Sequence, residues 1–235
     1  MNKASAGIAI FVKTPGISPL KTRLAATEGA EYAENWYRRA AAAVAEVAKR
    51  TGAAVYWAVA EAKAMDAAIW QDLPRIAQVQ SPLCEHATLG ARMHCVQQQL
   101  LARHSAAILL GADTPHIDVS VLRTVIEYLN DPQPRWAIAP ATDGGFWLHG
   151  ANRCARLSVW ESVRYSSADT LAQFLLAMRD YGDPARFPSE TDVDVAADLI
   201  ACASALARLS EPTDQQRTLL HWMRDQSGKN GAPNA

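Results

Sequence analysis

The chain has 235 residues, of which 49% are hydrophobic and 20% are charged, and its formal net charge is −1. This composition is typical of a globular protein that is long enough to bury a sizeable core. A charge so close to zero produces no field suited to nucleic acid or to an acidic membrane surface, so we expect no partner of either kind and place any anion-binding site locally.

The first half of the chain alternates between short strand-like runs and helical segments. GIAIFV (7–12) is β-branched and lacks polar alternation, as expected for a strand buried on both faces. Residues 28–52 are rich in helix formers and end at Lys49, Arg50 and Gly52, which is a helix stop signal. The pattern then predicts a strand at 53–60, a helical piece at 61–72, a strand at 75–80 and a helix at 88–104.

The second half continues the alternation. AAILLGAD (106–113) is the clearest buried strand, and the helix predicted at 118–130 has one apolar face, with Asp118 at its N-cap. A Ser166-x-x-Asp169 capping box opens a helix predicted at 167–182. The remaining predictions are a strand at 136–142, helices at 195–209 and 214–225, and a polar, disordered tail at 226–235.

Strands that alternate with helices predict βαβ units and hence a three-layer α/β/α fold with a mostly parallel central sheet. We find no repeat and no linker, so we expect a single domain over residues 1–225. The four cysteines are scattered and form no C-x-x-C pair, the N-terminus carries no signal-type apolar stretch, and no apolar run could span a bilayer. These features favour a cytoplasmic protein.

Three of the predicted strands are followed by loops that contain charged or polar residues and glycine. They are Lys13–Gly16 after the first strand, residues 111–116 after the fourth, and residues 142–145 after the fifth. Ligands of open α/β sheets bind at the carboxyl ends of the strands. We therefore expect two carboxylates and a cationic loop to face one crevice.

The loop after the first strand is a candidate phosphate cradle. Lys21 and Arg23 are charge-assisted donors, Pro15 and Pro19 stiffen the loop, and Gly16 lets the backbone approach a ligand. The alternative is an ordinary turn with solvated cations. The loop has neither the Walker A pattern nor G-x-G-x-x-G.

Acidic residues supply the other candidates. Asp113 ends a buried strand and could bind Mg²⁺ on a nucleotide's phosphates, since Asp118 already fills the place of the helix cap. Asp192 and Asp194 precede a helix, where capping is the local alternative to binding a metal. Cys84, His86, His94 and Cys95 match no standard zinc spacing.

The stretch DGGFWLHG (143–150) is a candidate acceptor site. Gly144 and Gly145 allow close backbone approach to a ligand, and Phe146 and Trp147 could stack on a base or a sugar. Burial in the core is the alternative for both aromatic side chains. Asp143 could orient the acceptor or act as a base.

Five stretches in register carry a resemblance to a known family: FVKTPGISPLKTRLA, LGADTPHI, PATDGGFWLHG, VRYSSADTLAQ and TDVDVAADL. Over residues 7–200 the chain resembles a bacterial family grouped with the nucleotide-diphospho-sugar transferases of the glycosyltransferase-A fold. Molybdenum-cofactor guanylyltransferase and phospholactate guanylyltransferase are similar in layout. The chain departs from wider relatives in lacking a G-x-G-T-R loop and in having Asp113-Thr114-Pro115 in place of D-x-D.

The resemblance implies a nucleotide-binding N-terminal half, an acceptor-binding C-terminal half, and a Mg²⁺ or Mn²⁺ ion held by Asp113 together with Asp192 or Asp194. The phosphate- or nucleotide-binding candidates are Lys13, Gly16, Lys21, Arg23 and Gly90. The sequence therefore predicts a metal-dependent nucleotidyl- or glycosyltransferase that uses a nucleoside triphosphate or nucleotide-sugar donor and a small phosphorylated or sugar-like acceptor. A non-catalytic nucleotide sensor with the same fold is the alternative.

Overall fold

The computed structural model describes residues 6–79 and 87–230. Its strands form one sheet in the order β3-β2-β1-β4-β6-β5-β7. All neighbouring strands are parallel except β6, which runs antiparallel to both β4 and β5. The strands are β1 (Gly7–Val12), β2 (Ala54–Val59), β3 (Arg75–Ala77), β4 (Ala107–Gly111), β5 (Trp136–Pro140), β6 (Phe146–Ala151) and β7 (Ala185–Arg186).

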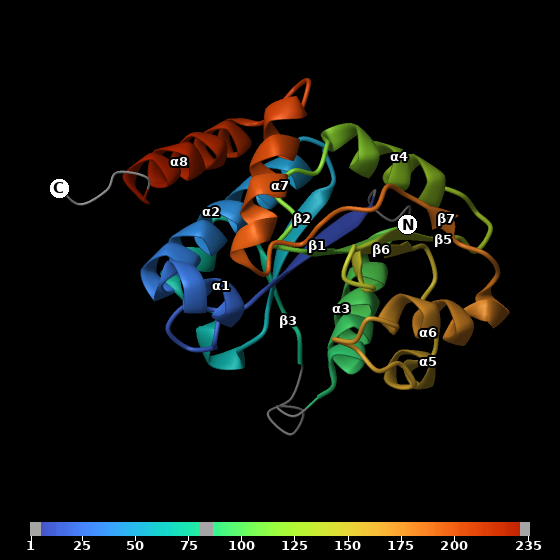
Figure 1. Cartoon of the computed structure of the whole chain (residues 1–235). Helices are drawn as coiled ribbons and strands as arrows, with labels where there is room; N and C mark the ends of the chain where they lie inside the picture. The colour runs from blue at the N-terminus through green and yellow to red at the C-terminus, as the bar shows by residue number, and fades with distance from the viewer. Residues whose placement is uncertain (1–5, 80–86, 231–235) are drawn as a thin grey trace.

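Helices cover both faces of this sheet, which confirms the predicted α/β/α layering (Figure 1). One face carries α1 (Thr22–Glu28), α2 (Ala30–Lys49), α4 (Val119–Leu129), α7 (Ala196–Arg208) and α8 (Asp214–Asn230). The other face carries α3 (Leu89–Arg103), α5 (Leu157–Glu161) and α6 (Thr170–Ala177). Short 3₁₀ turns are η1 (Ala62–Ala64), η2 (Ala68–Trp70) and η4 (Arg179–Tyr181).

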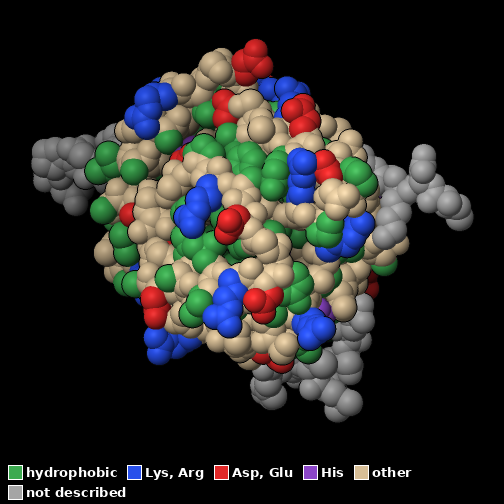
Figure 2. Space-filling model, turned by 90° about the vertical axis from the view of Figure 1, so that its right-hand side faces the viewer, with side chains coloured by type: hydrophobic (Ala, Val, Ile, Leu, Met, Phe, Trp, Pro, Cys, Tyr) green, Lys and Arg blue, Asp and Glu red, His purple; other side chains and the backbone are tan. Residues whose placement is uncertain are grey.

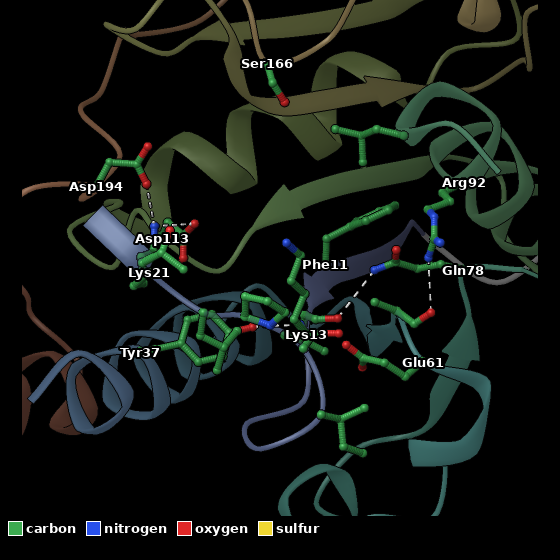
Figure 3. A pocket seen from close by; sticks show the side chains of 18 of the residues that line it. Phe11, Lys13, Lys21, Tyr37, Glu61, Gln78, Arg92, Asp113, Ser166 and Asp194 are labelled. Atoms are coloured by element: carbon green, nitrogen blue, oxygen red, sulfur yellow. Dashed lines mark hydrogen bonds and ion pairs between the residues drawn. The ribbon is translucent and has the colours of Figure 1, made fainter. Parts of the chain in front are cut away.

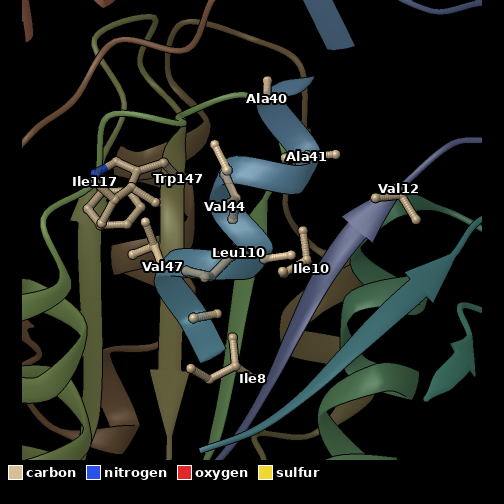
Figure 4. Packing of buried hydrophobic residues seen from close by; sticks show 14 of the residues in the cluster. Ile8, Ile10, Val12, Ala40, Ala41, Val44, Val47, Leu110, Ile117 and Trp147 are labelled. Carbon is tan, nitrogen blue, oxygen red and sulfur yellow. The ribbon is translucent and has the colours of Figure 1, made fainter. Parts of the chain in front are cut away.

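Helix α2 fixes the central strand from which the cationic loop leaves. Its alanines let the helix approach the sheet closely, and its valines pack on the side chains of β1 and β4 (Figure 4). Each fully buried valine or isoleucine contributes about 1.5–3 kcal/mol to stability. The contacting residues shown are Ile8, Ile10, Val12, Ala40, Ala41, Val44, Val47 and Leu110.

Several predicted elements have different bounds in the structure. Gly29, with φ of 90°, separates α1 from α2, so the predicted helix 28–52 is preceded by a further short helix. The predicted helical piece at 61–72 consists of two 3₁₀ turns. Helix α8 continues to Asn230, beyond the predicted end at residue 225, because an internal glycine weakens a helix by only about 1 kcal/mol. Residues 231–235 of the predicted tail lie outside the described part of the chain.

Strand β6 is the main element that the sequence pattern missed. The sequence pattern assigns no secondary structure to residues 143–150, whereas residues 146–151 form a strand between β4 and β5. The predicted capping box is also wrong: α6 begins at Thr170, Ser166 has a φ of 60°, and Asp169 caps no backbone amide with its side chain. The confirmed cap is Asp118, whose side chain accepts from the amide of Ser120 at 2.8 Å.

The strand order creates a crevice next to β1. Chain order runs outward from β1 to β2 and β3 on one side, and β4 lies on its other side, which is the switch point where open α/β sheets bind ligands. In the part of the chain that the structure describes, no helix is long and apolar enough to cross a membrane. Figure 2 shows a face on which Lys and Arg side chains are interspersed with Asp and Glu, without a large patch of one sign.

Candidate active site

A cavity of about 1270 Å³ opens at the carboxyl ends of β1, β2 and β4. Its wall includes three of the predicted cations and three of the predicted carboxylates, drawn from segments far apart in the sequence. Parallel strands bring their carboxyl ends to one edge, so the topology itself gathers these groups. They are Lys13, Lys21, Arg23, Asp113, Asp143 and Asp194.

Lys21 connects two of the carboxylates. Its Nζ lies 2.7 Å from Asp113 Oδ2 and 3.0 Å from Asp194 Oδ1, and its side chain is 5% exposed (Figure 3). Burial alone would lower the pKa of Lys21, but the two carboxylates outweigh burial and raise the pKa above its ordinary value. The ammonium is therefore charged at neutral pH and offsets part of the negative charge of this side of the site.

Asp192 lies close to this group but has another partner. Its Oδ1 accepts a hydrogen bond of 2.5 Å from Thr114 Oγ1. Burial, reinforced by the neighbouring charge of Asp113, raises the pKa of Asp192 to about 6. Of Asp192 and Asp194, only Asp194 forms an ion pair with Lys21, so Asp194 and Asp113 are the two carboxylates that share this lysine.

Neither Asp192 nor Asp194 is the N-cap of α7, so the capping role that the sequence offered as an alternative to metal binding is wrong. Asp198 accepts from the amides of Asp194 and Val195, each at 2.9 Å, and so satisfies the start of α7. The carboxylate of Asp194 remains available to Lys21 and to Arg23, whose Nη1 lies 3.6 Å from Asp194 Oδ2. Arg23 is otherwise exposed and reaches along the cavity wall.

Side chains from α2, from the segment after β2 and from η2 form hydrogen bonds with the start of the loop between β1 and α1. The hydroxyl of Tyr37 accepts from the amide of Lys13 at 2.8 Å, and Glu61 Oε2 accepts from the amide of Thr14 at 3.0 Å. The indole of Trp70 donates to Thr14 Oγ1 at 3.0 Å. These bonds fix the loop start while the side chain of Lys13 stays exposed to the cavity.

Two glycines predicted to bind nucleotide have structural roles in the fold. Gly16, with φ of 78°, forms the turn in which the amides of residues 17 and 18 donate to the carbonyl of Thr14, and it does not line the cavity. Gly90 lies in the first turn of α3, where a Cβ atom would overlap the carbonyl oxygen of Trp160. It therefore allows α3 to pack closely on α5.

The predicted acceptor residues are also redistributed. Asp143 lines the cavity, and its Oδ1 accepts from the amide of Gly145 at 2.8 Å. Phe146 and Trp147 pack into the two sides of the core, the alternative stated for aromatics, and Trp147 donates its indole N–H to the carbonyl of Pro188. Gly144 packs on Ala168 and does not line the cavity.

The cavity has further polar walls that sequence reasoning missed. Glu61, Gln78 and Arg92 line the side beyond Lys13, next to Phe11 (Figure 3). Arg92 donates to the carbonyls of Ala60 and Ala87, both at 3.1 Å. Glu61 lies two residues after the end of β2, and Gln78 directly follows β3. Position at a strand end was therefore the signal that could have identified them.

Ser166 and Ser167 line the opposite wall, and Figure 3 shows the Ser166 side chain directed toward the cavity. Ser166 has a left-handed backbone, which is uncommon for a serine. Ser166 was not identified as a cavity residue, because the Ser166-x-x-Asp169 spacing predicts a capping box at the start of a helix. Of the zinc-like set, Cys84 and His86 lie outside the described residues.

The carboxylates suit a hard divalent cation that completes its shell with water and phosphate oxygens. Mg²⁺ in nucleotide sites takes one or two carboxylates, and Asp113 Oδ1 is a buried oxygen without a hydrogen-bond partner. Within residues 6–79 and 87–230, no three Asp, Glu, His or Cys side chains are grouped as a complete metal site. Two carboxylates are enough only for a metal shared with a ligand, and Asp113 and Asp194 are the residues that would hold it.

Residues 43–167 match the family described as "Uncharacterized protein conserved in bacteria (DUF2064)". The chain belongs to this family. No curated protein matches the sequence. The predicted membership in a bacterial family of this fold is thus confirmed.

Solved structures show the same fold at low sequence identity. A "putative nucleotide-diphospho-sugar transferase" from Desulfovibrio desulfuricans G20 is 22% identical, with a TM-score of 0.78 over 96% of each chain. CMP:2-keto-3-deoxy-manno-octonic acid synthetase, solved with CTP, is 16% identical, with a TM-score of 0.54 over 87% of this chain and 99% of its own. The 4-diphosphocytidyl-2C-methyl-D-erythritol synthase of Anaerococcus prevotii DSM 20548 is 9% identical, with a TM-score of 0.52 over 87% and 97%.

Proposed function

We propose that this protein is a divalent-metal-dependent transferase that uses a nucleoside triphosphate or a nucleotide sugar as donor. One observation carries the proposal: a single cavity joins the cationic loop to the pair Asp113 and Asp194 at the switch point of the sheet. Cations beside paired carboxylates match what a metal-bound polyphosphate needs, since positive groups bind its oxygens and the carboxylates hold the metal. The fold shared with CMP:2-keto-3-deoxy-manno-octonic acid synthetase supports the same class of function.

The residues have distinct roles in this proposal. Lys13, Lys21 and Arg23 bind the phosphates of the donor, and Asp113 with Asp194 would hold Mg²⁺ or Mn²⁺. When bound, such an ion neutralises charge on the phosphate oxygens as the leaving group departs. The protein needs no nucleophile of its own, because catalysis of this kind consists mainly of positioning and electrostatic stabilisation.

The acceptor binds against the cavity wall opposite Glu61 and Arg92. Asp143 and Ser166 line this wall and supply a hydrogen-bond acceptor and a hydroxyl. Asp143 would accept the proton of an attacking hydroxyl, or orient an attacking phosphate through its hydrogen-bonded partners. This wall replaces the acceptor site that we predicted from Gly144, Gly145, Phe146 and Trp147.

Two reaction types share this arrangement and differ in their products. In nucleotidyl transfer the acceptor attacks the α-phosphorus of a nucleoside triphosphate and pyrophosphate leaves. In glycosyl transfer the acceptor attacks the sugar carbon of a nucleotide sugar and a nucleoside diphosphate leaves. Detection of pyrophosphate or of nucleoside diphosphate therefore assigns the type.

The first experiment is a thermal-shift panel of nucleoside triphosphates and nucleotide sugars, each with and without Mn²⁺. A ligand at 100 times its dissociation constant stabilises the fold by about 2.7 kcal/mol, which corresponds to a rise in Tm of roughly 5–10 °C for a chain of this size. We expect at least one nucleotide to produce such a shift only with Mn²⁺. A flat response across the panel would contradict the proposal.

Asp113→Asn tests the assignment of the site with little change in shape. We expect the apo protein to lose about 1–3 kcal/mol of stability, because Lys21 loses one of its two charged partners. The Mn²⁺-dependent shift and any turnover should disappear. A nucleotide shift in the wild type without turnover on any acceptor would instead favour the non-catalytic sensor.

A further inference from the structure

The position of Lys21 has a consequence for how a metal enters the site. Its ammonium donates to Asp113 Oδ2 and Asp194 Oδ1, which are oxygens of the two carboxylates that would hold a divalent cation (Figure 3). Mg²⁺ binds carboxylate oxygens at about 2.0–2.1 Å. An ion at that distance from both oxygens would occupy the space that Nζ now fills.

The lysine is held in this position by the fold. The backbone of Lys21 has φ of 43° and ψ of 44°. This is a left-handed conformation at the start of α1 that residues other than glycine rarely adopt. Its side chain is 5% exposed, and Nζ lies 5.8 Å from the centre of the Trp36 ring. The ammonium is thus an internal counter-ion of the carboxylate pair.

A free divalent cation that bound both of these oxygens would displace this ammonium and leave it buried without a negative partner, close to the incoming charge. A buried charge that loses its partner is strongly unfavourable. A polyphosphate removes this obstacle, because its oxygens accept from Lys21 as the metal takes over the carboxylates. Asp113 Oδ1, buried and without a hydrogen-bond partner, remains as a further ligand atom for the metal.

We infer that Lys21 keeps the carboxylate pair closed to free divalent cations and admits the metal only together with a polyphosphate. The ligand class of the site is then the preformed complex of a divalent cation and a polyphosphate. This inference rests on the proposed function for the identity of the site. It adds an order of binding, and it identifies Lys21 as the residue that imposes that order.

The test measures Mn²⁺ binding by water proton relaxation, which responds to slowly tumbling, protein-bound Mn²⁺. Lys21→Met keeps the length of the side chain and removes its charge. We expect Lys21→Met to bind Mn²⁺ alone at least tenfold more tightly than the wild type does. Lys63→Met is the matched control, because Lys63 is an exposed lysine that lines the same cavity, and it should stay within twofold of the wild type.

The wild type provides a second test that requires no variant to fold. Inorganic triphosphate should increase its affinity for Mn²⁺ at least tenfold, whereas in Lys21→Met this increase should be much smaller. Equal Mn²⁺ affinity of the wild type and a folded Lys21→Met would overturn the inference, as would tight binding of Mn²⁺ alone by the wild type. These titrations contain no nucleotide, so their outcome is distinguishable from a flat nucleotide panel.

Discussion

Gly144 lies so close to Ala168 that a Cβ atom on Gly144 would overlap the carbonyl oxygen of Ala168. The carbonyl of Gly144 also accepts a hydrogen bond of 2.8 Å from the amide of Leu171. The turn after β5 is therefore packed directly on the segment that carries Ser166 and Ser167 into the cavity wall. The glycine acts through this contact, by setting the position of the proposed acceptor wall.

We predict that Gly144→Ala displaces the segment 166–168. The new methyl group would meet backbone atoms that cannot rotate away, and φ of 91° is already unfavourable for alanine. We expect a loss of about 2–4 kcal/mol in unfolding free energy, measured by urea denaturation. The control is Gly182→Ala, where φ is 83° but no atom lies within 4 Å of the added Cβ. Equal losses in the two variants would show that steric contact with Ala168 is unimportant.

We predict that Ser166 contributes to acceptor binding through its hydroxyl, while its backbone conformation lowers the stability of the fold. Its φ of 60° is unfavourable for serine and natural for glycine, so we expect Ser166→Gly to match or exceed the wild-type stability, by up to about 1 kcal/mol. Both Ser166→Gly and Ser166→Ala should raise the KM for the acceptor, because both lack the hydroxyl. Thermal melts and acceptor titrations measure the two effects separately. An unchanged KM in both variants would remove Ser166 from the acceptor wall.

His149 predicts a stability change in acid that is independent of the active site. The ring is buried in β6, edge-on to Trp160 and Phe174, and burial lowers its pKa to about 3. The unfolded chain takes up this proton near pH 6.5 but the folded chain does not, so stability is full above pH 6.5 and falls as the pH decreases toward 3. We expect this residue to account for a loss of roughly 3 kcal/mol between pH 7 and pH 4.

The measurement compares urea unfolding of the wild type and His149→Gln at several pH values. The glutamine variant will be less stable at pH 7, and the difference between the two proteins should shrink by that same amount as the pH falls to 4. His221→Gln is the control, since the side chain of His221 is 80% exposed. A difference that stays constant with pH would show that His149 titrates alike in the folded and unfolded chains.

The sequence by itself determined the layers of the fold and the edge of the sheet that carries the site. Short apolar runs such as residues 7–12 and 106–110, separated by segments rich in helix formers, are typical of strands buried on both faces of a sheet that helices cover. Polar residues at the ends of those strands then had to share one edge. The strand ends in the sequence therefore predict that Lys21 and Asp113 lie together, as the structure shows.

Tertiary structure alone decided which groups touch. Strand β6 forms a hairpin with β5 but also pairs with β4 through long-range contacts that no local period encodes. Its position between the two strands buries Trp147 and aligns the Gly144 turn with Ala168. The choice of Asp194 over Asp192 as the partner of Lys21 depends on Asp198 and Thr114 satisfying competing demands for hydrogen bonds. Periodicity and residue type indicate whether a segment forms a helix or a strand and which face it buries, whereas the pairing of charges depends on distances that arise only when separate segments pack.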